Sequence, residues 1–178
     1  MRDLPLFNVV RTALLSRLAA RGIVIDMRQS MQPTAEGIPE GPCLFAHLVT
    51  DVRHGWPQRK DQWNADAEEF QHVESEQMLT TLQFSAQAPR NPADLTALTP
   101  GDYAKAAAAA MQSDVFLADL RAAGVGVLRI GQVRTGYTTG DRDEFDPDPS
   151  FDVTFTHRDE TVEVIRPIES LEIEIHRV

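Results

Sequence analysis

The sequence predicts a single α+β domain over residues 1–178, in which two main helices pack on a mixed, mainly antiparallel sheet. The first observation is the segment 74–87, in which every second side chain is apolar or small: Met78, Thr80, Leu82, Phe84 and Ala86. Strand side chains alternate between two faces, so one face of this segment should lie on a core. The second observation is helical spacing in the stretches 5–21 and 99–123. A chain of this length is expected to bury one sizeable core.

The N-terminal helix is predicted between Pro5, which suits a first turn, and Gly22, which suits the residue after a helix. Between them, apolar side chains recur at helical spacing: Phe7, Val10, Leu14 and Leu18. A helix on a membrane surface is the alternative, but the polar side carries few cations. Polar residues interrupt the apolar run, so neither a signal peptide nor a membrane span is expected.

The next part of the chain is predicted to alternate between strands and loops. Strands are expected at 23–28 and 43–52, with a loop rich in proline and glycine at 31–42. The hydrophobic pattern breaks at 53–69, which we therefore interpret as a loop before the central strand.

The second helical region should begin at Thr99, a capping residue followed by Pro100 and the acidic Asp102. Ser113 and Asp114 are expected to start a further helix. The remaining predicted elements are strands at 125–137, 151–156, 161–165 and 171–176, an acidic loop at 140–150 and a turn at 157–160.

Composition argues against two classes of function. The net charge is -10, with 27 acidic and 17 basic residues, which disfavours a protein that wraps DNA or binds anionic membranes. Cys43 is the only cysteine, so an internal disulfide and a cysteine-rich metal site are excluded. Its apolar surroundings predict an inert, buried thiol, and the composition is typical of a protein made in a reducing cytoplasm.

The acidic loop is the strongest candidate for cation binding. Asp141 and Asp143 have the spacing of the first ligands of a helix-loop-helix calcium site, and Asp152 falls at its twelfth position. However, Phe145 takes a ligand position and Asp146 takes the position that requires glycine. A solvated loop or an assembly arm is therefore preferred, and we expect no metal and no cofactor.

No catalytic constellation is apparent in the sequence. The five histidines lack metal-ligand spacing, and there is no nucleophile-elbow or glycine-rich phosphate motif. A protein interface is the sharper interpretation of Trp56, Arg59, Lys60 and Trp63, since tryptophan and arginine are enriched at the energetic centres of interfaces. Folding of the tryptophans back onto the core, and stacking on nucleic-acid bases, are the alternatives.

The order of elements resembles the neck or tail terminator proteins of tailed phages and prophages, also called gateway proteins. The segments that carry the resemblance are LFNVVRTALL, HGWP, ESEQMLTTLQFSAQ, TPGDYAKAAAAAMQSDVFLADLRAAGV and FDVTFTHRDETVEVIRPIESLEIE. The resemblance implies a virion structural protein without catalysis. It implies a ring, commonly a hexamer, that ends the tail tube or joins it to the head connector while DNA passes through.

A ring requires two different patches that meet between neighbouring subunits. The tryptophan and cation cluster is expected to form one patch. The acidic loop is expected to form the other: Asp141, Asp143, Glu144, Phe145 and Asp146. A small cytosolic α+β enzyme and a monomeric adaptor of a phage-tail-like apparatus are the competing functions, and solution mass would separate them from a ring.

Overall fold

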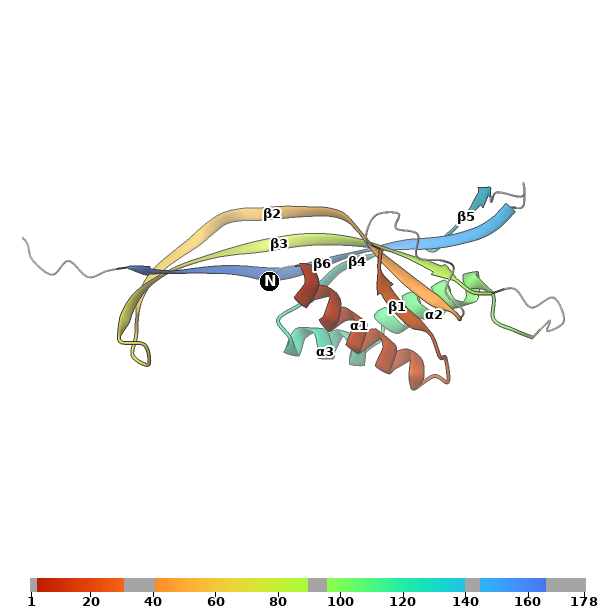
Figure 1. The fold of residues 1–178 in the computed structure, drawn as a ribbon, viewed down its shortest axis with the longest axis horizontal. Coiled ribbons are helices and arrows are strands. Elements are labelled where there is room, and N and C mark those ends of the chain that lie inside the picture. The colour runs from red at the N-terminus through yellow and green to blue at the C-terminus, as the bar shows by residue number, and fades with distance from the viewer. Residues whose placement is uncertain (1–2, 31–40, 90–95, 140–144, 166–178) are drawn as a thin grey trace, which may run out of the picture.

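A computed structural model of the chain describes residues 3–30, 41–89, 96–139 and 145–165. These residues form three helices and six strands (Figure 1). In chain order they are α1 (Asp3–Ala19), β1 (Asp26–Gln29), β2 (Cys43–Asn64), β3 (Glu69–Gln87), α2 (Pro100–Met111), α3 (Asp114–Ala122), β4 (Gly126–Ile130), β5 (Arg134–Thr139) and β6 (Phe145–Ile165).

The six strands form one sheet in the order β1-β2-β3-β6-β4, and β5 pairs with the first residues of β6. Only the β1–β2 pair is parallel, and the other pairs are antiparallel. The predicted segment 74–87 lies in β3 at the middle of the sheet. The predicted fold class, a single α+β domain with a mixed and mainly antiparallel sheet, is therefore confirmed.

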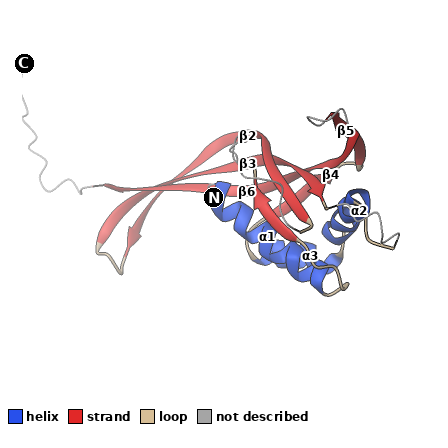
Figure 2. Ribbon diagram, turned by 45° about the vertical axis from the view of Figure 1, so that its right-hand side comes forward, coloured by secondary structure: helices blue, strands red, loops and turns tan. Residues whose placement is uncertain are grey.

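The three helices cover one face of the sheet and bury the core against it (Figure 2). The alternation in β3 predicts this face, since Thr80, Leu82, Phe84 and Ala86 are buried while the alternate residues 81, 83 and 85 are partly exposed. Phe84 stacks on Phe151 of β6 with ring centroids 5.4 Å apart. The small side chains of α2 let its backbone approach the sheet closely: Ala104, Ala107, Ala108 and Ala110 are buried.

The predicted helix boundaries are confirmed by their caps. Thr99 and Asp102 form a reciprocal capping box, in which the Thr99 hydroxyl accepts from the Asp102 amide and the Asp102 carboxylate accepts from the Thr99 amide. Ser113 caps α3 in the same way, by accepting from the Phe116 amide. Gly124 follows α3 with a φ of 75°, a left-handed conformation that glycine adopts without strain.

The interpretation of residues 53–69 as a loop was wrong. β2 continues to Asn64, and the turn to β3 occupies only residues 65–68. None of the three described helices lies beneath this part of the sheet (Figure 1), so its side chains lack the apolar alternation that marks a strand on a core. Cross-strand pairing with β3 makes it a strand. A register shift between His54 and Gln58 accommodates Pro57, which has no amide hydrogen to donate.

Three further expectations need correction. Residues 157–160 do not turn, because β6 runs without interruption to Ile165 and pairs with β3 throughout this part. The second half of the predicted acidic loop, from Phe145 onward, is strand paired with β5. The predicted strand at 125–137 is divided into β4 and β5. Residues 31–40, 141–144 and 171–176, for which a loop, the acidic patch and a last strand are expected, lie outside the described residues.

Candidate assembly surface

Three strands extend beyond the helices as a long, narrow arm (Figure 1). We define the arm as residues 53–64 of β2, 69–78 of β3 and 157–165 of β6, in which β3 pairs with β2 on one side and with β6 on the other. The strands β1 and β4 end before it, since β1 pairs only with residues 43–46 and β4 only with residues 153–156. The arm therefore has two wide faces and two long edges, and it carries all four residues of the predicted tryptophan and cation cluster.

A buried polar chain crosses the sheet where the arm meets the body. The Thr80 hydroxyl donates to the Asp51 carboxylate at 2.6 Å, and its oxygen lies 2.8 Å from Nε2 of His157. Because the hydroxyl has only one proton, Nε2 must be the donor in the second bond. Thr80 is fully buried and His157 is 2% exposed. This chain links β2, β3 and β6 at the base of the arm, and sequence reasoning missed it because it placed His157 in a turn.

Charged side chains pair along the arm face that continues the core face. Arg59 lies 2.6 Å from Glu74, and His72 contacts both Asp61 at 2.5 Å and Glu74 at 3.5 Å. The hydrogen bond to Asp61 raises the pKa of His72, with a further contribution from Glu74. The hydrogen bond from Arg59 lowers the pKa of Glu74. These pairs join β2 to β3, so they support the arm without a core beneath it.

The two predicted tryptophans have different surroundings on the arm. Trp63 packs edge-on against Phe70, its partner on β3, with ring centroids 5.0 Å apart. It remains 52% exposed, whereas Trp56 is 93% exposed at the bulge in β2. Neither ring is folded back onto the core. An almost fully exposed indole is a candidate contact for a partner, because tryptophan is enriched at protein interfaces.

Asp146, the acidic residue of the predicted patch that the structure describes, lies at the opposite end of β6. Asp146 pairs with Thr138 of β5, sixteen residues before Val162, the β6 residue level with Lys60. At about 3.3 Å per residue the separation along the strand is roughly 50 Å. Within one chain, therefore, the structure does not bring Asp146 and the tryptophan and cation cluster together. Phe145 lies beside Asp146 in β6, and the other predicted members, at 141, 143 and 144, lie outside the described residues.

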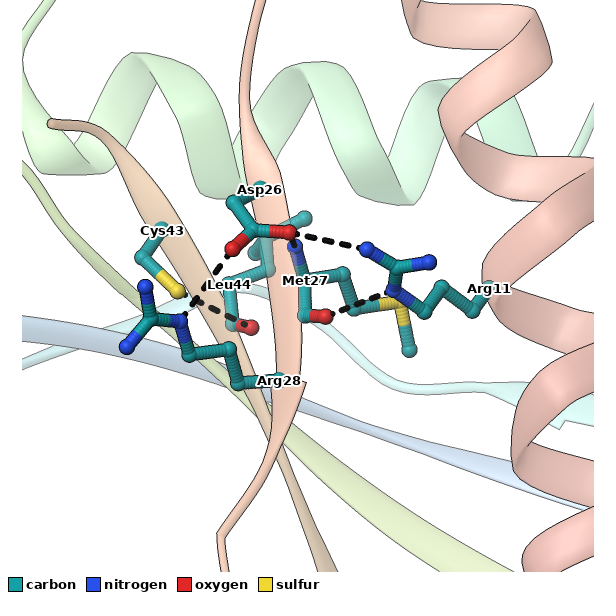
Figure 3. A network of polar contacts seen from close by, with 6 residues as sticks. All are labelled: Arg11, Asp26, Met27, Arg28, Cys43 and Leu44. Carbon is teal, nitrogen blue, oxygen red and sulfur yellow. Dashed lines mark hydrogen bonds and ion pairs between the residues drawn. The ribbon is translucent and has the colours of Figure 1, made fainter.

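The thiol of Cys43 is enclosed by a structural network that joins α1 to the sheet (Figure 3). Arg11 donates to the Asp26 carboxylate at 3.0 Å and to the Met27 carbonyl at 2.8 Å. Cys43 is fully buried, and this burial, with the nearby charge of Asp26, raises the pKa of its thiol. A buried thiol with a raised pKa has little thiolate and is a poor nucleophile, as predicted.

The polar groove on the face of the sheet opposite the helices does not assemble a catalytic set. Its volume is about 720 Å³. The Asp152 carboxylate at its floor accepts from Arg134 at 2.7 Å and from Gln83 at 3.2 Å, and the hydroxyls of Thr81 and Thr154 bond to each other. These groups satisfy one another and include no nucleophile paired with a base. In the described part of the chain, no group of three potential ligand residues could hold a metal ion.

Residues 5–165 match the family model described as E217 gateway protein gp29. The chain belongs to this gateway protein family. The match covers the helices, the central sheet and the arm, so the resemblance seen in the sequence is confirmed over most of the chain. No curated protein matches the sequence.

One solved structure to which the gateway chain is similar is described as the sheath/tube terminator of the PVC extracellular contractile injection system in its extended state. The sequence identity is 11% and the TM-score is 0.40. The match covers 96% of this chain and 63% of that terminator, so this chain spans less than two thirds of the other protein.

Proposed function

We propose that this gateway chain is a structural virion protein that forms a ring at the neck or tail of a phage or prophage. The proposed ring, a hexamer, ends the tail tube or joins it to the head connector, and DNA passes through it. The observation that carries this proposal is the family match over residues 5–165. The net charge of -10 suits a channel that must release its DNA, because an acidic wall does not retain phosphates.

The proposed role requires no catalysis. The charged groups of the arm and of the groove pair with one another: Arg59 with Glu74 on the arm, and Arg134 with Asp152 in the groove. We propose that the protein has no turnover, no cofactor and no membrane partner, and that it is present in host cytoplasm only until it joins the particle. No helix in the described residues has the length and apolarity that a membrane crossing requires. A small enzyme and a monomeric adaptor are the competing functions.

Deletion and complementation of the gene test the proposal directly. Particles made without the protein should have unattached heads or tails of abnormal length when viewed by electron microscopy, and the wild-type chain should restore them. Isolated particles should contain the chain, in a ring visible at the neck or tail end. Normal particles from the deletion strain would rule out the proposed role, and a hydrolytic or transfer activity lost with one polar residue would favour an enzyme.

A further inference from the structure

Among the described residues, no further strand pairs with the outer edges of the arm at 53–64 of β2 and 160–165 of β6, and we propose that in neighbouring copies of the chain the β2 edge of one arm pairs with the β6 edge of the next. The surface is thus an interface for a second copy of this chain, formed by backbone hydrogen bonds between strands. This inference deepens the proposed function, because it names the contact that would build the ring.

The first observation is the pairing of the arm strands. Among the described residues, 53–64 of β2 and 160–165 of β6 pair only with β3. Each edge therefore presents a row of backbone donors and acceptors, and such a row pairs readily with another strand. Apolar side chains on both edge strands are exposed, including Trp56 at 93% and Val164 at 59%. Among the described residues, pairing with a further strand protects neither of these two stretches.

The second observation is the opposite charge of the two edges. Residues 53–64 carry three cationic side chains and one carboxylate, whereas residues 160–165 carry two carboxylates and no cationic side chain. Pairing two β2 edges would place Lys60 and Arg59 near their own copies, and pairing two β6 edges would do the same with Glu160 and Glu163. Like charges directly across a strand pair are destabilising and opposite charges are favourable. Charge therefore favours the unlike pair, β2 with β6.

The strand directions make the unlike pair compatible with a closed ring. β2 and β6 are both antiparallel to β3, so they run parallel to each other. Rotation about an axis along the arm keeps every strand direction, and it brings the β6 edge of one copy to the β2 edge of the next. Such a contact is heterologous, and it produces a ring when the rotation closes. Six arms of three strands would make a barrel about as large as those of 16–18 strands that enclose an aqueous channel.

The register between the two paired edges can be derived from the residues that lie side by side across the sheet of one chain. Within one chain Lys60 is level with Val162, and Gln58 is level with Glu160. Closure of a barrel requires a stagger between strands. A stagger of two residues keeps the faces aligned and places Lys60 of one copy directly beside Glu160 of the next. The sheet twists between body and arm (Figure 1), so the arms can pair while the wider bodies lie apart.

Disulfide cross-linking of mixed chains tests the edge pairing. We would replace Cys43 by Ala, then make two populations, one with Gln62→Cys on the β2 edge and one with Cys at position 160, 162 or 164 on the β6 edge. Oxidation of the mixture should give a covalent dimer with at least one of the three, and neither population should cross-link alone. Val73→Cys in the central strand is the matched control and should not cross-link. Absence of the mixed dimer at all three positions would refute the edge pairing.

A charge exchange gives an independent test. Lys60→Glu and Glu160→Lys should each reduce ring formation severalfold, and the chain with both changes should recover it. Lys105→Glu on α2 is the matched control, since Lys105 is exposed on the body and is the only other lysine. Its ring formation should equal that of the wild type. A double variant as weak as the singles, with all variants folded by circular dichroism, would contradict the charge argument.

The two tests separate this inference from the proposed function. They are made first on isolated particles, by mass spectrometry of the cross-linked peptides. If the chain is absent from particles, the proposed function fails, and the same cross-linking on concentrated purified protein still decides whether the edges pair. If the chain is present in particles but only a β2–β2 or β6–β6 dimer forms, the function stands and the edge pairing is wrong.

Discussion

The Arg11 guanidinium of α1 lies 3.0 Å from the Asp26 carboxylate of β1. The same guanidinium donates to the Met27 carbonyl, so one side chain holds the first helix to the edge of the sheet. Both side chains are partly exposed, at 41% and 45%, so solvent weakens the ion pair. The link is therefore structural and of moderate strength.

Arg11→Ala should lower the free energy of unfolding by about 1 kcal/mol, because a charge-assisted contact to β1 is lost. Arg28→Ala is the matched control, since Arg28 also donates to Asp26 but does not connect β1 to α1. It should cost less in urea denaturation. An equal loss in both variants would show that the connection to α1 is not what stabilises the fold.

Protonation of the Asp26 carboxylate in acid should also lower the free energy of unfolding. Burial alone would raise the pKa of this carboxyl, but hydrogen bonds from Arg28, the Met27 amide and Arg11 lower it below the ordinary value of 3.8. Because the pKa of Asp26 is lower in the folded state, its contribution to the free energy of unfolding is complete above the pKa of the unfolded state. This contribution is lost as the pH falls through the pKa of the folded state. Denaturation midpoints of wild type and Asp26→Asn, measured from pH 6 to pH 2, should therefore converge in acid. A constant difference between them would contradict this role.

His72 should titrate above its ordinary pKa of 6.5, because Asp61 and Glu74 accept from its ring. Its raised folded pKa stabilises the arm fully below the unfolded value, and this contribution is lost as the pH rises through the folded value. NMR titration should show the shift, and Asp61→Asn should reduce it. Asp66→Asn in the adjacent turn is the control and should leave the titration of His72 unchanged. An unshifted His72 in the wild type would mean that the contact with Asp61 does not persist in solution.

Leu82→Asp should unfold the domain. Leu82 is 7% exposed in the core face of β3, and an unpaired buried carboxylate costs several kcal/mol. Circular dichroism should show loss of cooperative unfolding. Gln77→Asp is the control on the same strand, at an exposed position, and should leave the transition in place. A folded Leu82→Asp chain would place the core elsewhere.

The double variant Trp56→Ala, Trp63→Ala should keep the fold and lose assembly. Trp56 is 93% exposed, and truncation of an exposed side chain changes stability by about 0.5 kcal/mol or less. Trp63 contacts Phe70, so its loss should loosen only the tip of the arm. Circular dichroism should match the wild type, and electron microscopy of complemented particles should show fewer completed tails. Phe70→Ala alone is the control for loosening of the tip. Normal particles with the double variant would show that this cluster is not an assembly surface.

The predicted partner of this cluster was the acidic segment, and the structure adds a geometric condition to that proposal. Asp146 and Lys60 lie at opposite ends of the molecule, so a contact between them would join copies displaced along the arm. The edge pairing proposed above joins copies side by side instead. Phe145→Ala distinguishes these arrangements, since it should impair only the displaced contact.

Local patterns in the sequence determine the body of this protein. The alternation through Leu82 and Phe84 specifies the buried face of the central strand, because a strand on a core must separate apolar from polar side chains. Thr99 and Ser113 specify two helix starts, because free amides at a helix end require a local acceptor. These signals lie within a few residues of the features that they predict, and the structure confirms them.

The arm was decided only by the tertiary structure. Residues 53–64 contain Pro57, three cations and two tryptophans, and they become strand because β3 supplies backbone partners on both sides of the register shift at Pro57. His157 looks like part of a turn, yet it is buried because Thr80, 77 residues earlier, lies beside it. In the described part of the chain no core lies under residues 53–64, so no hydrophobic period marks them as a strand. Residues 74–78 and 161–165 were predicted as strands, but pairing between distant segments leaves no local signal, and for that reason their union with 53–64 in one arm could be found only in the fold.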